Sequence, residues 1–188
     1  PENIFILAGG QFEVMIMDFG LAKRIQEIKG EDVFKTVAGE IVGSPAYIAP
    51  ETVQCDPVDG RTDLYSVGIM LFECLTGKRP IDSLSSVGFL TAHMVAPPLT
   101  LIEAAPDRKW PAAAEKLVAR LLEKSRDERP KSAAEALEEL TAVAPELIGM
   151  GLPEGAQPAD QALTKRMLSM TLLGRLATPS PAGASSLA

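Results

Sequence analysis

The chain has 188 residues, 46% of them hydrophobic and 23% charged, which is typical of one globular domain that buries about two thirds of its unfolded surface. Its formal net charge of -7 leaves no basic stripe to neutralise phosphates, and this argues against a nucleic-acid-binding protein. Two cysteines, Cys55 and Cys74, are too few for a disulfide framework and favour a reducing, cytoplasmic setting.

A β-hairpin is predicted over residues 3–17, where the apolar strands NIFIL and FEVMIM flank the segment AGGQ, whose glycines permit a tight reversal. The hairpin brings Asn3, before the first strand, near Asp18, after the second, because opposed side chains in a ladder lie about 5 Å apart at Cβ. An amide oxygen and a carboxylate at that separation are hard ligands that suit Mg²⁺. Taken alone, however, the hairpin favours a plainer alternative, in which Asp18 caps the turn after its strand and Asn3 only begins the first strand.

The segment LYSVGIMLFECLTG is apolar nearly all round, but its unbroken run is too short for a membrane span. It therefore predicts a helix buried in the core, with Thr62 as its N-cap and Gly77 as its C-terminal stop. Ser132 and Glu135 form a capping-box pattern that predicts the start of another helix. The single histidine, His93, has no acid or nucleophile placed around it and is predicted to be a surface or helical residue without a catalytic role.

The composition changes after about Pro145 to Pro, Ala, Gly and Ser. We therefore expect a folded domain over residues 1–145 and a low-complexity, disordered tail over residues 146–188, because the tail has little apolar surface to bury. The chain begins at Pro1 rather than methionine, so we also expect it to be a fragment. It would then be a cytoplasmic protein or the cytoplasmic part of a longer, membrane-anchored one.

Five motifs occur in order along the chain. They are PEN at 1–3, DFG at 18–20, GSPAYIAPE at 43–51, DLYSVG at 63–68 and the arginine of SRDERP at 125–130. This series, over about residues 1–143, resembles the C-terminal lobe of a eukaryotic-type protein kinase, and LFECLTGKRP and ERPKSAAEAL are most similar to its bacterial serine/threonine branch. The resemblance implies a mainly α fold with a small β-hairpin, which would be α+β when complete and whose N-terminal lobe is missing.

The resemblance also implies that Asn3 and Asp18 hold Mg²⁺ against the phosphates of ATP, which reverses the preference drawn from the hairpin alone. Phe19 and Gly20 follow Asp18 in the same motif and belong to the nucleotide site. Phe5 would lie under the adenine ring, unless it is only a core residue of its strand. The implied activity is the Mg²⁺-dependent transfer of the ATP γ-phosphate to serine or threonine of protein substrates.

Residues 18–51 correspond to the activation segment of the family. Ser44 matches the hydroxyl residue that supports the catalytic base and seats the substrate, which favours serine and threonine over tyrosine substrates. Glu51 is implied to form a structural ion pair with Arg129. Asp63 is implied to accept backbone N–H bonds from the catalytic loop, although an Asp63 that only caps its own helix is the alternative.

Two residues of this segment are predicted to be regulatory. A phosphate on Thr36 would add a charge of about -1.5 to -2 and order the segment against arginines, and mass spectrometry of active enzyme would detect it. The fixed charge of Glu40 would partly substitute for a regulatory phosphate, and an unchanged rate in Glu40→Gln would remove this idea. The alternative for Glu40 is an ordinary solvated glutamate.

The catalytic aspartate of the family pattern H-R-D-x-x-x-x-N would lie upstream of Pro1, as would the Gly-rich loop and the strand lysine of an N-terminal lobe. We therefore expect this polypeptide alone to bind ATP weakly and to transfer no phosphate. An alternative is an inactive lobe, or pseudokinase, that serves as a docking module. The presence of both Asn3 and Asp18 favours the kinase, whose partners would be ATP and protein substrates, with no nucleic acid and no membrane span within the chain.

Overall fold

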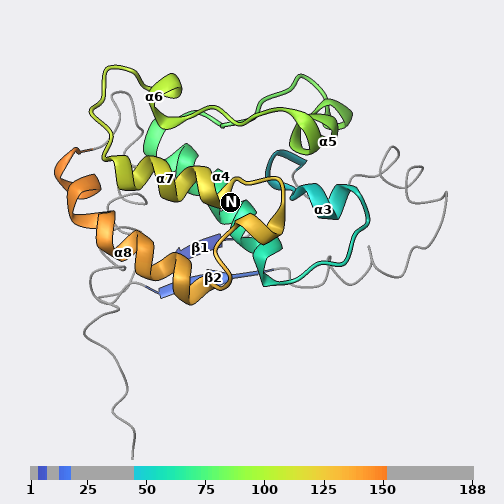
Figure 1. Cartoon of the computed structure of the whole chain (residues 1–188), viewed down its shortest axis with the longest axis horizontal. Coiled ribbons are helices and arrows are strands. Elements are labelled where there is room, and N and C mark those ends of the chain that lie inside the picture. The colour runs from blue at the N-terminus through green and yellow to red at the C-terminus, as the bar shows by residue number, and fades with distance from the viewer. Residues whose placement is uncertain (1–3, 8–12, 18–44, 152–188) are drawn as a thin grey trace, which may run out of the picture.

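The structure is a computed structural model of the whole chain, and it describes residues 4–7, 13–17 and 45–151 (Figure 1). The described part is mostly helical, with a two-stranded sheet near the start of the chain. In chain order its elements are β1 (Ile4–Leu7), β2 (Glu13–Ile16), η1 (Pro45–Tyr47), α3 (Pro50–Val53), α4 (Gly60–Thr76), α5 (Ser86–Val95), α6 (Leu101–Ala104), α7 (Ala112–Leu121), η2 (Arg126–Glu128) and α8 (Ala133–Gly149), where η marks a 3-10 helix.

The predicted β-hairpin is present. Strands β1 and β2 are antiparallel, and their pairing runs from Ile4 opposite Ile16 to Leu7 opposite Glu13. Each strand has four residues, which is fewer than the apolar run that predicted it. Ile16 keeps 53% of its surface exposed, so β2 stands outside the buried core that the helices form.

Helix α4 is the predicted apolar helix. It ends as expected, because Gly77 takes the left-handed conformation (φ 71°) and donates its N–H to the Glu73 carbonyl. Its start differs from the prediction, since the N-cap is Asp59 and not Thr62. The Asp59 carboxylate accepts the Arg61 N–H at 2.8 Å, while Thr62 reaches back to accept the Asp59 N–H. Both residue types cap helices well, and Asp59 takes the role because its carboxylate reaches the first-turn donors.

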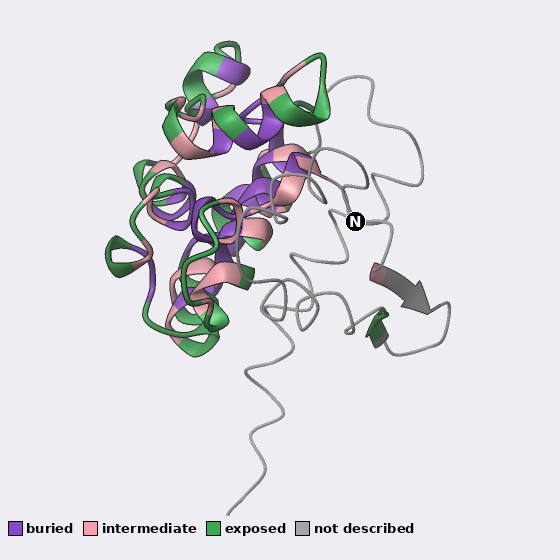
Figure 2. Cartoon of the chain, turned by 90° about the vertical axis from the view of Figure 1, so that its right-hand side faces the viewer, coloured by how far each residue is buried: buried purple, intermediate pink, exposed green. Residues whose placement is uncertain are grey.

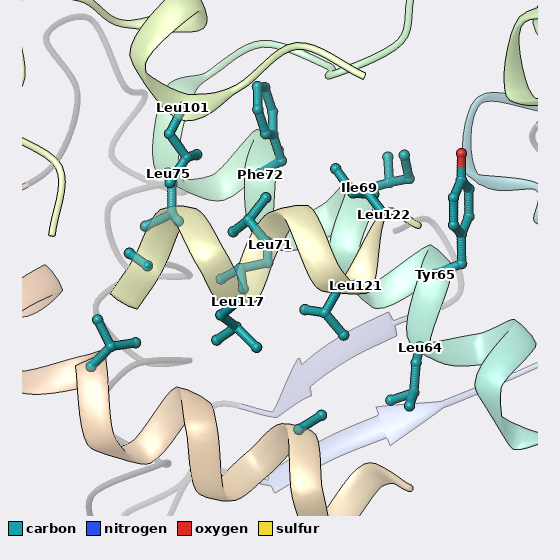
Figure 3. Close-up of a cluster of buried hydrophobic side chains, with 14 of the residues drawn as sticks. Leu64, Tyr65, Ile69, Leu71, Phe72, Leu75, Leu101, Leu117, Leu121 and Leu122 are labelled. Carbon is teal, nitrogen blue, oxygen red and sulfur yellow. The ribbon is translucent and has the colours of Figure 1, made fainter. Parts of the chain in front are cut away.

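The core is arranged around α4, which contacts α6, α7, α8 and η1. Figure 2 shows that the buried residues gather on the inward faces of the helices. Helix α7 presents one apolar face to α4, because its buried residues recur three and four positions apart, as a helical period of 3.6 requires. Among the described residues, no helix is long and apolar enough to cross a membrane. The core side chains labelled in Figure 3 are Leu64, Tyr65, Ile69, Leu71, Phe72, Leu75, Leu101, Leu117, Leu121 and Leu122.

The crossing of α4 and α7 depends on Gly68. A Cβ atom added at this position would lie 2.8 Å from Leu121 Cβ and 3.1 Å from Leu122 Cδ2. Since carbon atoms in proteins are in good contact at about 3.5–4.0 Å, the two helix backbones are as close as a glycine allows.

We expect Gly68→Ala to lower the free energy of unfolding by about 1–2 kcal/mol, because overpacking of the crossing outweighs the better helix propensity of alanine. The matched control is Gly60→Ala in the same helix, where an added Cβ meets nothing within 4 Å and stability should stay the same or rise slightly. Urea unfolding of both variants measures the difference. A Gly68→Ala variant as stable as the unchanged chain would show that the crossing relaxes freely.

Helix α8 begins close to the prediction. Ser132 accepts the Glu135 N–H at 3.2 Å as expected, but the Glu135 carboxylate accepts from the Lys131 N–H, one residue before the predicted partner. The helix then continues through Pro145 to Gly149. Leu147 is only 3% exposed, and its burial stabilises the last turn despite the N–H that a proline lacks.

Candidate functional site

Many of the predicted site residues lie outside the described part of the chain. These are Asn3, Asp18, Phe19, Gly20, Thr36, Glu40 and Ser44. Phe5 belongs to β1, for which the structure describes the backbone, and Glu51, Asp63 and Arg129 lie in the helical part. The candidate site is therefore built from η1 and α3, which directly follow Ser44 along the chain.

Pro50 shapes this segment. Ala49 is extended, with φ -79° and ψ 149°, because the residue before a proline is pushed out of the helical region. Pro50 then opens α3, where the absence of its N–H leaves no hydrogen bond unmade. Ala46 and Ala49 are buried, so the backbone on both sides of Tyr47 is seated against the helices rather than on the surface.

A buried ion pair joins α3 to Arg129, the residue that follows η2. Arg129 Nη1 donates to Glu51 Oε1 at 2.8 Å, and Arg129 Nη2 donates to Glu51 Oε2 at 2.9 Å. The two parallel bonds are the geometry in which an arginine and a carboxylate bind most strongly. The side chains keep only 0% and 7% of their surface exposed. The contact that the sequence predicted between Glu51 and Arg129 is therefore present.

Every N–H of the Arg129 guanidinium has an acceptor. Besides the two bonds to Glu51, Nε donates to the Glu123 carbonyl at 2.8 Å, Nη1 to the Arg61 carbonyl at 2.9 Å and Nη2 to the Lys124 carbonyl at 3.1 Å. A guanidinium has five such donors. Because a buried charge is costly unless it is paired and hydrogen-bonded, this complete set explains how Arg129 is accommodated without water.

The Glu51 carboxylate is ionised in this environment. Burial is the largest single effect and would by itself raise the pKa of Glu51. Hydrogen bonds from Arg129, from the Glu51 backbone and from Thr62, together with the charge of Arg129, outweigh burial and lower the pKa below its ordinary value. The contact is therefore an ion pair at neutral pH and not a neutral hydrogen bond.

Helix α4 holds Tyr47 through two polar residues that sequence analysis did not single out. Ser66 Oγ donates to the Tyr47 carbonyl at 2.7 Å, and the Tyr47 hydroxyl donates to Glu73 Oε2 at 2.5 Å. Ser66 and Glu73 are seven positions apart, which places them on the same face of the helix. Polar residues two turns apart in an otherwise apolar helix are the sequence signal that could have revealed this contact.

His93 differs from the prediction of a surface or helical residue in one respect. It lies in helix α5, but it is 0% exposed, and its Nε2 lies 3.1 Å from the Ala46 carbonyl oxygen while its Nδ1 lies 3.0 Å from the Tyr65 hydroxyl. The buried residues of α5 are Phe89, Leu90 and His93, one helical face. The position of His93 on that apolar face is the signal that the sequence carried.

Asp63 lies in the first turn of α4. Its alternative role as the cap of its own helix is wrong, because Asp59 is the N-cap. Asp63 is exposed as a whole residue. The surrounding protein still removes part of the water from its carboxylate, and this desolvation raises the pKa of Asp63. The structure gives the Asp63 carboxylate no hydrogen bond to a residue within 45–151, so a role toward another segment stays a prediction.

Comparisons with known proteins show which family the chain is similar to. Residues 1–140 match a family model described as the protein kinase domain. Serine/threonine-protein kinase pkn3 of Myxococcus xanthus is 38% identical over 145 residues, which are 76% of this chain and 26% of that protein. The corresponding values are 37% over 143 residues, 76% and 17% for pkn2 of the same organism, and 34% over 143 residues, 76% and 22% for PknB of Mycobacterium tuberculosis. The chain thus spans a small part of the length of these curated relatives.

Proposed function

The chain belongs to the protein kinase family, in its bacterial serine/threonine branch, and we propose that it is the C-terminal lobe of a kinase that phosphorylates proteins. The reaction is the transfer of the ATP γ-phosphate to a serine or threonine hydroxyl. In this proposal Ser44 supports the catalytic base and, with the segment that follows it, seats the substrate.

One observation carries the proposal. The bidentate ion pair between Glu51 and Arg129 is buried and uses both carboxylate oxygens, so the segment after Ser44 has a fixed position relative to the helices. Phosphoryl transfer depends on positioning of the reactants and on electrostatic stabilisation. A substrate-binding segment therefore needs such an anchor, whereas an ordinary surface loop does not.

The register of the hairpin supports a metal role for Asn3 and Asp18. Ile4, the first residue of β1, is opposite Ile16, the last residue of β2, which is the strand register that the predicted site requires. An amide oxygen and a carboxylate are ligands that fit Mg²⁺ together with phosphate oxygens. When bound, the metal would neutralise charge on the phosphates of ATP; the two side chains would hold it there.

The 188 residues contain no H-R-D pattern before Asn3 and no Gly-rich loop with a strand lysine. The family's general base and the groups that bind the ATP phosphates are therefore missing from this polypeptide. We expect the purified chain to bind ATP weakly and to show no phosphoryl transfer to a protein substrate. Incorporation of labelled phosphate by the chain alone would contradict this.

The function is tested in the chain extended upstream by the sequence encoded before Pro1, which we expect to read H-R-D-x-K at its junction. The extended chain should phosphorylate serine or threonine in a generic basic protein substrate with ATP and Mg²⁺. Asp18→Asn should lower kcat at least about 100-fold, as loss of a group that stabilises transition-state charge does. The matched control is Asp82→Asn, which removes a surface contact to Arg79 and should leave the rate unchanged.

If the upstream sequence lacks the H-R-D pattern, or if the extended chain is inactive while folded, the kinase proposal fails. The alternative, a docking module built on the same fold, would then be preferred.

A further inference from the structure

A chain of hydrogen bonds crosses the buried interior from one side of the domain to the segment after Ser44. Lys124 Nζ lies 3.3 Å from the Tyr65 hydroxyl, that hydroxyl lies 3.0 Å from His93 Nδ1, and His93 Nε2 lies 3.1 Å from the Ala46 carbonyl oxygen. The Tyr65 hydroxyl points away from the leucines of the core in Figure 3. Four groups from separate parts of the sequence are thus linked in one chain, in which His93 lies between Tyr65 and Ala46.

The acceptor at one end fixes the direction of every bond. A backbone carbonyl can only accept, so His93 Nε2 must carry the hydrogen. The neutral ring then leaves Nδ1 as an acceptor, and the Tyr65 hydroxyl must donate to it. The oxygen of that hydroxyl in turn accepts from Lys124, which has donors and no acceptor. All four groups are satisfied only when His93 is neutral and holds its hydrogen on Nε2.

The surroundings of His93 oppose a second proton. Arg129 and Lys124 lie over the Tyr65 ring, 4.9 Å and 5.7 Å from its centroid, and Arg79 lies over the Phe89 ring that stacks on His93. Glu51, the acid of this cluster, is already bound twice by Arg129. Burial, with the nearby charge of Lys124, lowers the pKa of His93 to about 4, and burial lowers the pKa of Lys124 to about 8.

Tyr65 connects this chain of hydrogen bonds to the ion pair. The face of its ring lies under Arg129, which forms the ion pair with Glu51. Its hydroxyl lies within hydrogen-bond distance of His93, which in turn contacts the Ala46 carbonyl. The two ends of the segment from Ala46 to Glu51 are therefore fixed by opposite parts of one side chain of α4. Ala46 is the end nearer to Ser44.

We propose that His93 is a positioning residue for the protein substrate, which as the Nε2–H tautomer fixes Ala46 and the η1 turn beside Ser44. The inference deepens the proposed kinase function and rests on it for its kinetic consequence. His93 touches neither substrate nor nucleotide, because it acts through the backbone of η1. Loss of its bond to Ala46 frees the substrate-seating end of the segment and leaves Glu51 anchored.

Two conservative variants separate the two nitrogen atoms of the ring. The amide nitrogen of His93→Gln lies near the position of Nε2 and can still donate to the Ala46 carbonyl. The oxygen of His93→Asn lies near the position of Nδ1 and can still accept from Tyr65, but the shorter side chain cannot reach Ala46. The Gln variant should therefore rescue what the Asn variant loses.

In the extended chain, we expect His93→Asn to raise KM for a protein substrate about 3- to 10-fold, the value of one neutral hydrogen bond. KM for ATP and kcat should stay within about 2-fold, and His93→Gln should lie close to the unchanged enzyme. Equal losses in the Asn and Gln variants, or an equal rise in KM for ATP, would overturn the proposal, because a merely structural role predicts those results.

A second measurement needs no activity and so separates failure of this inference from failure of the kinase function. Nitrogen NMR of the 188-residue chain should show His93 neutral at pH 6.5, with its hydrogen on Nε2. Amide exchange of residues 46–49 should be faster in His93→Asn than in His93→Gln. Tyr65→Phe, which keeps the ring under Arg129 and removes only the hydroxyl, should leave the hydrogen on Nε2, because the Ala46 carbonyl still requires a donor there. A hydrogen on Nδ1, a charged ring at pH 6.5, or identical exchange in the two His93 variants would refute the inference even if the enzyme is active.

Discussion

Replacing Arg129 with alanine is expected to lower the free energy of unfolding by about 3–5 kcal/mol, the loss found when one partner of a buried ion pair is removed. The substitution leaves the Glu51 carboxylate ionised and buried, and it removes five hydrogen bonds and the packing on Tyr65. Domains of this size are stable by about 5–15 kcal/mol, so much of the population would unfold in mild denaturant. Urea unfolding followed by circular dichroism measures the change.

The matched control is Arg120→Ala. Arg120 forms ion pairs with Glu135 and Glu139, but these side chains are about one third exposed, at 28%, 34% and 31%. Exposed pairs contribute about 0–1 kcal/mol, so this arginine should be much less important than Arg129. Similar losses in the two variants, or an unchanged melting temperature in Arg129→Ala, would show that the buried pair is not the anchor of the segment.

Acid is expected to destabilise the domain before its carboxylates titrate, through His93. Burial holds the pKa of His93 at about 4 in the folded chain, against about 6.5 when unfolded. The folded state therefore favours neutral His93, and the stabilisation is complete above the unfolded pKa and is lost as pH falls from 6.5 toward 4. Between pH 7 and pH 5 the free energy of unfolding should fall by about 2 kcal/mol.

His93 is the only histidine in the chain, which makes the origin of this change easy to identify. The lowered pKa values of the acids Glu51 and Asp59 affect stability in a lower window, below their unfolded values of 4.5 and 3.8. Urea unfolding at half-unit steps between pH 5 and pH 7 should show the slope in the unchanged chain. The slope should vanish in His93→Gln, and a slope that persists there would assign the effect to another group.

Local patterns were sufficient for several elements of the fold. The glycine-linked hairpin, the stop of α4 at Gly77 and the cap of α8 at Ser132 each depend on residues within about four positions of one another. The prediction of Thr62 as the N-cap of α4 was wrong. Asp59 and Thr62 are both good capping residues three positions apart, and the sequence does not say which of them begins the helix. The ion pair of Glu51 with Arg129 was found only through the order of the family motifs.

The sequence by itself thus determined the helical class, the hairpin, and the two residues of the buried ion pair. Tertiary structure alone decided the hydrogen-bond partners of His93, the close crossing at Gly68 and the continuation of α8 through Pro145. The hydrogen-bond partners of His93 lie 28 and 47 positions away along the chain, and no periodicity within α5 encodes which backbone carbonyl will face it. Such contacts are fixed when helices pack, because packing chooses the neighbours that local propensity leaves open.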